Sequence, residues 1–276
     1  MELDTKISIA TGILTAIIFT YASVAIRDTP FVWYQTRLFG LISYFFLFMT
    51  VLIGELRVLS KDKSRLKIFR FHKPIAIFSL FLVLVHGFAA VADNYKWGAQ
   101  LSFSQYLGFS FGDKWLTLLS FGTLAFYLMI LVALTSFKRS VRALGYRRWK
   151  RIHYLSYLLF AIAFTHAAGL GTDIKHSQIS IVIYPLVYAS MLIVLSLFLA
   201  RLAHGAFKLS DQTEINLTAV LFCALVIGAF LFVKVKLMLE DDIQKARFEI
   251  ENRQKAIGLA NNSLEEAIEA NARLSE

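Results

Sequence analysis

The chain has 276 residues but only one cysteine, Cys223, and this scarcity excludes several kinds of redox centre. A single thiol cannot form an intrachain disulfide, a CxxCH haem-attachment motif or the four-cysteine set of an iron–sulfur cluster. The sequence also lacks a glycine-rich dinucleotide fingerprint after a strand and a polar stretch long enough for a flavin or nicotinamide domain. Any cofactor bound within this chain is therefore expected to be held non-covalently.

Charged residues are scarce as well, at 17% against 57% hydrophobic residues, with a mean hydropathy of +0.60. This composition is too apolar for an ordinary soluble domain. We therefore predict an all-α, polytopic membrane helical bundle with about seven transmembrane helices and a polar helical extension at the C-terminus. The apolar runs long enough to span a bilayer are Ile7–Ile26, Leu38–Leu56, Pro74–Val91, Trp115–Thr135, Ile152–Leu170, Ile179–Leu202 and Leu217–Val235.

The first run has to be distinguished from a signal peptide, because Ser23 and Ala25 would suit the small-residue positions of a cleavage site. Its leader carries Glu2 and Asp4 beside a single basic residue, Lys6, and is not a basic n-region. We therefore expect an uncleaved helix.

Basic residues gather in two loops, which the positive-inside rule places in the cytoplasm. They are Arg57, Lys61, Lys63, Arg65, Lys67, Arg70 and Lys73 in one loop, and Lys138, Arg139, Arg142, Arg147, Arg148, Lys150 and Arg151 in the other. The predicted topology in the plasma (inner) membrane has a cytoplasmic N-terminus and an extracytoplasmic tail after Val235. These two loops account for much of the net charge of +10, so the expected partners are membrane lipids and not nucleic acid.

Four histidines lie near the ends of two of the apolar runs. His72 and His86 are fourteen residues apart, and His153 and His166 are thirteen apart. These spacings rise about 21 Å and 20 Å along a helix, within a hydrocarbon layer of about 30 Å. The predicted topology then gives two levels: an inner pair, His72 with His153, and an outer pair, His86 with His166.

Ionisable side chains within membrane spans are costly, so they usually mark a path for ions, protons or a cofactor. Neutral imidazole is a common haem ligand, and two facing helices can hold a porphyrin between their histidines. The alternative is that the four histidines are packed or relay protons, as in a haem-free proton-coupled transporter.

The paired histidines resemble the ferric reductase-like transmembrane domain, over roughly Leu38 to Leu202. That family includes the membrane cores of NADPH oxidases and ferric reductases, and the haem subunit of a bacterial methionine sulfoxide reductase system. The resemblance implies two b-type haems, each ligated by one histidine of each helix, and electron transfer from the cytoplasmic side to an extracytoplasmic acceptor. Lacking its own flavin or NADPH domain, such an oxidoreductase component would take electrons from a donor protein, a quinol or a bound flavin.

A second hypothesis makes the chain the haem-bearing membrane anchor of a separate periplasmic reductase that docks on the outer loops or the tail. Under either hypothesis, Arg70 and Arg151 flank the inner pair and are candidates to neutralise haem propionates. The alternative for these arginines is contact with lipid headgroups alone.

The unequal spacings raise a geometric problem. At about 100° per residue, fourteen residues return His86 to within about 40° of His72, whereas thirteen leave His166 about 140° from His153. A regular helix cannot turn both of the latter toward one partner, so we predict a π-bulge, a kink or a non-helical start near His153. Pro74 favours a helix start at or just after His72.

The expected organisation is an N-terminal helix and loop (1–37), a haem-binding core (38–203), a seventh span (204–236) and a helical tail (237–276). The tail repeats Ile243, Ile250, Ile257 and Leu264 every seven residues, which is typical of a weak coiled-coil seam. The tail is either a docking or self-associating helix or a solvated amphipathic one. The aromatic loop around 93–114 is expected at the outer interface, where it could cover the outer pair.

Overall fold

The computed structural model describes residues 3–26, 30–59, 63–93, 103–175, 180–207, 213, 216–228, 243, 246–255, 257–258 and 261. Within these ranges the chain is helical, with short turns and no strand. It divides into two compact units, residues 1–222 and 223–276, and each is described by itself. The predicted all-α architecture is confirmed.

The described residues up to 207 form ten α-helices and one 3₁₀ helix. They are α1 (Leu3–Ala25), α2 (Pro30–Leu59), η1 (Lys63–Phe71), α3 (His72–Ala92), α4 (Phe103–Leu107), α5 (Lys114–Thr135), α6 (Lys138–Leu144), α7 (Tyr146–His153), α8 (Leu155–Leu170), α9 (Thr172–Lys175) and α10 (Ser180–Phe207).

Six helical segments within the described residues are long and apolar enough to cross a membrane: α1, α2, α3 with the end of η1, α5, α7 with α8, and α10. Each coincides with one of the predicted runs, so a multi-pass bundle is confirmed. The described part of the seventh run forms the shorter helix Asn216–Gly228. The rest of that run lies outside the described residues, so a seventh span stays a prediction.

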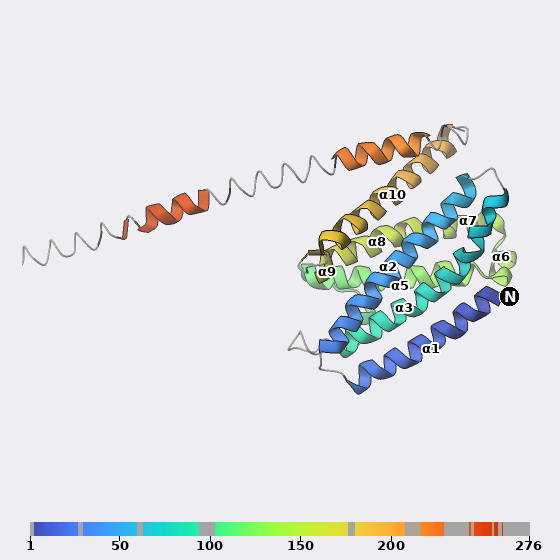
Figure 1. Ribbon diagram of the computed structural model, residues 1–276, viewed down its shortest axis with the longest axis horizontal. Coiled ribbons are helices and arrows are strands. Elements are labelled where there is room, and N and C mark those ends of the chain that lie inside the picture. Colours follow the sequence, from blue (N-terminus) through green and yellow to red (C-terminus); the bar gives the residue numbers. More distant parts are fainter. Residues whose placement is uncertain are drawn as a thin grey trace, which may run out of the picture. The chain divides into compact units, whose positions relative to one another are not determined.

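Two helix pairs build the part of the bundle that carries the four histidines (Figure 1). In one, α2 packs against α3, and α1 covers α3. In the other, α5 packs against α8. Contacts of α2 with α8 and of α3 with α5 join the pairs, and α10 packs on α2 and α8. Helices α3 and α8 therefore each contact both α2 and α5, and the four histidines lie on α3 and on the α7–α8 segment.

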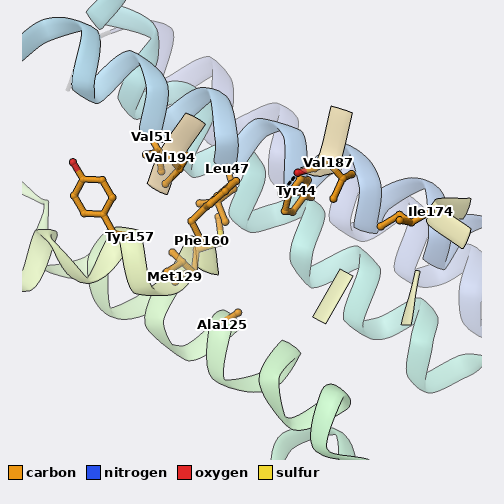
Figure 2. Close-up of a cluster of buried hydrophobic side chains, with 11 residues drawn as sticks. Tyr44, Leu47, Val51, Ala125, Met129, Tyr157, Phe160, Ile174, Val187 and Val194 are labelled. Atoms are coloured by element: carbon orange, nitrogen blue, oxygen red, sulfur yellow. Dashed lines mark hydrogen bonds between the residues drawn. The ribbon is translucent and has the colours of Figure 1, made fainter. Parts of the chain in front are cut away.

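A cluster of buried apolar side chains from α2, α5, α8, α9 and α10 includes Phe160, which lies midway between His153 and His166 along the chain (Figure 2). Phe160 of α8 is fully buried, and its ring centroid lies 5.3 Å from that of Tyr44 and 6.1 Å from that of Phe48, both on α2. On α3, fully buried Ser79 donates a hydrogen bond to the Ser43 carbonyl at 3.1 Å. The layer between the levels is thus packed with buried side chains, as protein interiors are.

The local sequence determines where helices α3 and α5 start. Helix α3 begins at His72 itself, directly after η1, and Pro74 lies in its first turn, where proline costs no hydrogen bond. Helix α5 is capped by Asp113, whose carboxylate accepts a hydrogen bond from the Leu116 backbone at 2.8 Å. The predicted start of the third span is therefore confirmed.

The second half of the loop between α3 and α5 is fastened onto the bundle. The Tyr106 hydroxyl donates to the Ala90 carbonyl at 3.0 Å, and the Thr123 hydroxyl donates to the Tyr106 carbonyl at 2.6 Å. Ser110 and Ser120 exchange two further hydrogen bonds at 2.8 and 2.9 Å. Burial, and then the nearby Asp93, raise the pKa of Tyr106 above its ordinary value. Residues 94–102, including the predicted belt residues Tyr95 and Trp97, lie outside the described residues.

In the second unit, residues 246–255 are helical, and Lys255 pairs with Glu251 at 2.8 Å, one turn earlier. Ile243, Ile250 and Ile257, three members of the predicted seam, are exposed. Leu264 lies outside the described residues. The tail's role in docking or self-association stays a prediction.

Candidate functional site

The four histidines form two facing pairs, one at each level. The ring centroids of His72 and His153 are 6.1 Å apart, and those of His86 and His166 are also 6.1 Å apart. The ring planes differ by 56° in the inner pair and by 83° in the outer pair. The structure therefore brings together the same partners that the sequence predicts, each pair built from α3 and from the α7–α8 segment.

A break in the α7–α8 segment resolves the spacing of thirteen. Helix α7 ends at His153 and α8 begins at Leu155, with Tyr154 as a turn between them. The Tyr157 amide donates to the Tyr154 carbonyl three residues earlier, at 3.2 Å, so the chain is locally tightened. The predicted interruption near His153 is confirmed, and it turns both histidines toward α3.

Three of the four histidines are oriented by a backbone carbonyl of a supporting helix. The Nδ1 atom lies 2.9 Å from the Thr50 carbonyl in His72, 2.8 Å from the Thr36 carbonyl in His86, and 2.8 Å from the Leu118 carbonyl in His166. A carbonyl oxygen only accepts, so Nδ1 carries the hydrogen and Nε2 keeps its lone pair. Metal-ligating histidines are typically held in this way through their other nitrogen.

Glycines make room for these three rings. A Cβ atom at Gly40 would lie 2.9 Å from the His86 ring, one at Gly122 would lie 2.6 Å from the His166 ring, and one at Gly54 would lie 3.2 Å from the His72 ring. Each glycine stands four residues after the carbonyl that its histidine contacts. The missing side chain therefore lets the imidazole reach the helix backbone.

His153 is held differently, by a side chain. Its Nδ1 lies 3.3 Å from the Ser136 hydroxyl, at the C-terminal end of α5. The hydroxyl hydrogen is used in a 2.7 Å bond to the Val132 carbonyl, so the oxygen accepts from the imidazole. This histidine thus has the same protonated nitrogen as the other three, with a longer hydrogen bond.

Each histidine pair suits a metal ion whose other ligands come from a cofactor. Two metal–nitrogen bonds of about 2.0 Å, plus about 1.1 Å from each nitrogen to its ring centroid, separate two imidazole centroids by about 6 Å. Both pairs match this separation. Among the described residues, no group of three or more His, Cys, Asp or Glu side chains is arranged to hold a bare ion. A porphyrin would supply nitrogen ligands of its own, so one histidine pair at each level would be enough to hold a haem there.

Comparison with known proteins agrees with this geometry. Residues 39–164 match the family of the ferric reductase like transmembrane component. This segment of the chain therefore resembles a ferric reductase-like transmembrane domain. The match includes His72, His86 and His153, and it ends two residues before His166. The resemblance drawn from the sequence is therefore confirmed, and a domain of this family indicates transmembrane electron transfer.

One curated relative is the magnetosome protein MamZ of Paramagnetospirillum magneticum, which is 26% identical over 163 residues. The alignment covers 59% of this chain but only 22% of that protein. No solved structure matches the chain.

Aromatic rings flank the inner pair of the ferric reductase-like domain. Phe69 stacks on His72 with a centroid distance of 5.1 Å and an interplanar angle of 15°. Trp149 stacks on His153 with a centroid distance of 5.1 Å and an interplanar angle of 26°. The ring centroid of the exposed Tyr146 lies 5.6 Å from that of Trp149. The Trp149 Nε1 atom is buried and has no hydrogen-bond partner among the described residues. Such a donor suits the carboxylate of a bound group.

The two candidate arginines take different positions. Arg70 pairs with Asp4 of α1 at 3.4 Å and lies over the Phe71 ring, and Arg151 is exposed on α7. Contact of either arginine with a propionate stays a prediction. His204 lies in the last turn of α10, and His176 falls outside the described residues.

A buried charged cluster beside the inner pair was not predicted from the sequence. Glu55 accepts a hydrogen bond from the Tyr157 hydroxyl, and its other oxygen lies 2.6 Å from the Arg201 guanidinium. Glu55 directly follows Gly54, and Tyr157 lies one turn after His153. A carboxylate within the apolar run Leu38–Leu56 is itself a signal of a functional or structural role. Its partner is 146 residues away, so the sequence does not indicate the pairing.

Proposed function

We propose that this chain carries electrons across a membrane through two b-type haems, one at each level. His72 and His153 would ligate the inner haem, and His86 and His166 the outer one. The observation that supports this most directly is the shared 6.1 Å separation of both pairs. When bound, haem supplies a one-electron iron couple at each level.

The chain's own residues would orient the ligands and keep the site dry. The carbonyls of Thr36, Thr50 and Leu118 fix the tautomer in which Nε2 is the ligating nitrogen. The buried side chains packed around Phe160 favour a fixed distance between the levels. The carbonyl bonds also raise the basicity of the ligating nitrogens.

The proposed direction follows from the charge distribution along the sequence. The basic loops mark the side of His72 and His153 as cytoplasmic. A membrane potential that is negative inside drives an electron outward by about 2.3 kcal/mol per 100 mV. We expect a donor protein, a quinol or a bound flavin at the inner pair, where Tyr146 and Trp149 connect the surface with His153.

The direct test is the reduced-minus-oxidised spectrum of the detergent-purified protein, with haem quantified per chain. We expect close to two b haems, falling to one in His72→Ala and to one in His86→Ala. A folded wild-type protein without haem would refute the proposal and favour the haem-free proton-coupled transporter.

A second candidate function is the haem-bearing anchor of a separate reductase on the outer face. The matched segment of MamZ is a small part of that protein, which supports a domain that works with further parts. The loop segment 103–113, which is fastened to α3 and α5, offers an ordered surface for such a partner. Purified alone, an anchor would bind haem and be reduced, yet would pass no electrons to ferric iron, oxygen or a quinone. Turnover with any of these acceptors would contradict this role.

A further inference from the structure

The supporting positions for the histidines repeat along α2. The carbonyls of Thr36 and Thr50 are fourteen residues apart, and Gly40 and Gly54 follow them at the same interval of four. The sequence repeats with them, as TRLFG at 36–40 and TVLIG at 50–54. Each repeat thus combines an accepting carbonyl with a glycine that lets the imidazole approach it.

The same repeat runs along α5, with one difference. Leu118 supplies the outer carbonyl, and Gly122 follows four residues later. Fourteen residues farther along, Val132 stands at the carbonyl position and Ser136 at the glycine position. Three of the four positions therefore have glycine, and the fourth has serine.

The serine lies between its histidine and the carbonyl. The Ser136 hydroxyl donates to the Val132 carbonyl at 2.7 Å and accepts from His153 at 3.3 Å. The other three Nδ1 atoms reach a carbonyl at 2.8 to 2.9 Å. A separation of 3.3 Å lies beyond the usual 2.7–3.2 Å range of N–H···O bonds, so this bond is the weakest of the four.

We propose that Ser136 sets the inner haem apart from the outer one, by weakening the hydrogen bond to its ligand His153 and so raising the inner reduction potential. The inference rests on the proposed function, because it concerns a haem at the inner pair. Ser136 acts through His153 and is thus a positioning residue.

The sign follows from the chemistry of the imidazole. A strong acceptor at Nδ1–H makes Nε2 more basic, and a more basic ligand favours Fe(III) over Fe(II), which lowers the potential. The longer bond from His153 to the Ser136 hydroxyl raises the basicity of Nε2 less, and therefore lowers the reduction potential less. A tenfold change in the ratio of Fe(III) to Fe(II) affinity shifts a one-electron potential by 59 mV. Redox titration resolves a shift of that size.

The experiment is a potentiometric titration of both haems in the wild-type protein and in four variants, with haem counted per chain. Ser136→Gly opens the path to the Val132 carbonyl and should lower the inner potential. Ser136→Ala removes the acceptor and should raise it. Ser136→Thr keeps a hydroxyl and should restore the wild-type value.

Thr135→Ala is the matched control. Its hydroxyl makes the same kind of backbone bond one residue earlier, to the Leu131 carbonyl at 2.7 Å, and has a longer contact of 3.2 Å with the Val132 carbonyl. Neither contact involves His153, so both haems should keep their potentials. Low-spin ferric EPR should show the inner signal alone changing in the Ser136 variants.

Two results would overturn the inference. One is an inner potential that stays unchanged in both Ser136→Gly and Ser136→Ala. The other is a shift in Thr135→Ala of equal size to those in the Ser136 variants. Either outcome, with two haems retained in the wild-type protein, refutes the role of Ser136 and leaves the proposed function standing. A wild-type protein without haem refutes the proposed function itself.

Discussion

Helices α2 and α3 pair in an unbroken register, whereas α5 faces a helix that is interrupted at Tyr154. Along α2 and α3, contacts recur in steps of seven residues: Thr36 with His86, Ser43 with Ser79, and Thr50 with His72. A spacing of fourteen suits such a register because it is close to four helical turns. The thirteen residues between His153 and His166 do not, and the break supplies the missing rotation. One site geometry is therefore reached from two different helix geometries.

The two levels differ in their surroundings as well. The inner pair has stacked rings, a buried Glu55–Arg201 pair and a serine in place of a glycine. The outer pair has the two glycines closest to histidine rings, Gly40 and Gly122. The outer level is thus defined mainly by close backbone approach, and the inner level by side chains. Substitutions that bring a side chain close to a histidine should therefore disturb the outer level more, and substitutions that remove side-chain contacts should disturb the inner level more.

The largest effect is expected from Glu55→Gln, which breaks a feature that only the inner level has. The substitution leaves the Arg201 charge without its carboxylate in a site where both side chains are mostly buried, 14% and 12% exposed. Breaking a buried pair in this way costs about 3 kcal/mol or more. We expect a lower midpoint of unfolding in detergent, followed by tryptophan fluorescence.

The control for Glu55 is the double variant Glu55→Gln with Arg201→Gln, which removes both charges and should recover part of the lost stability. A single variant as stable as the wild type would show that the pair contributes nothing to the inner level.

The sequence predicts the two levels because histidines are rare in apolar spans and because their spacing can be converted to depth and angle. The same arithmetic predicts the break near His153. The roles of Gly40, Gly54 and Gly122 could not be read from the sequence, since they are three of 14 glycines and their partners lie on other helices. The TRLFG and TVLIG repeat would have been the one available signal.

The second effect in size is expected at the outer level from Gly122→Ala. Its new Cβ would lie 2.6 Å from the His166 ring, so the imidazole has to move away from its carbonyl. Loss of such an orienting contact typically costs tenfold to a hundredfold in affinity. Haem per chain should fall toward one after gel filtration, with the outer haem lost.

Gly228→Ala is the control for this variant. It makes the same chemical change in an apolar helix outside the matched segment 39–164, and its Cβ would meet nothing within 4 Å. Retention of two haems in both variants would show that close approach at Gly122 is not needed.

A smaller effect, confined to the inner level, is expected from Trp149→Phe. Phenylalanine keeps a ring against His153 but removes the buried N–H, which lacks a partner among the described residues. If this group donates to a haem carboxylate, its loss should weaken inner haem retention by up to about tenfold, the lower part of the range for hydrogen bonds to charged groups. Transfer of haem to apomyoglobin measures the change. Equal transfer rates in the wild type and the variant would exclude this donor role.

The smallest effect is expected from Gly54→Ala, the inner counterpart of Gly122→Ala. A Cβ at Gly54 would lie 3.2 Å from Cε1 and 3.6 Å from Nδ1 of His72, so a shift of a few tenths of an ångström relieves the contact. Alanine also favours the helix by about 1 kcal/mol over glycine, which offsets part of the cost. We expect two haems per chain and only a small change in the inner EPR signal. Loss of the inner haem in this variant would mean that both levels depend equally on close backbone approach, and the contrast between them would fail.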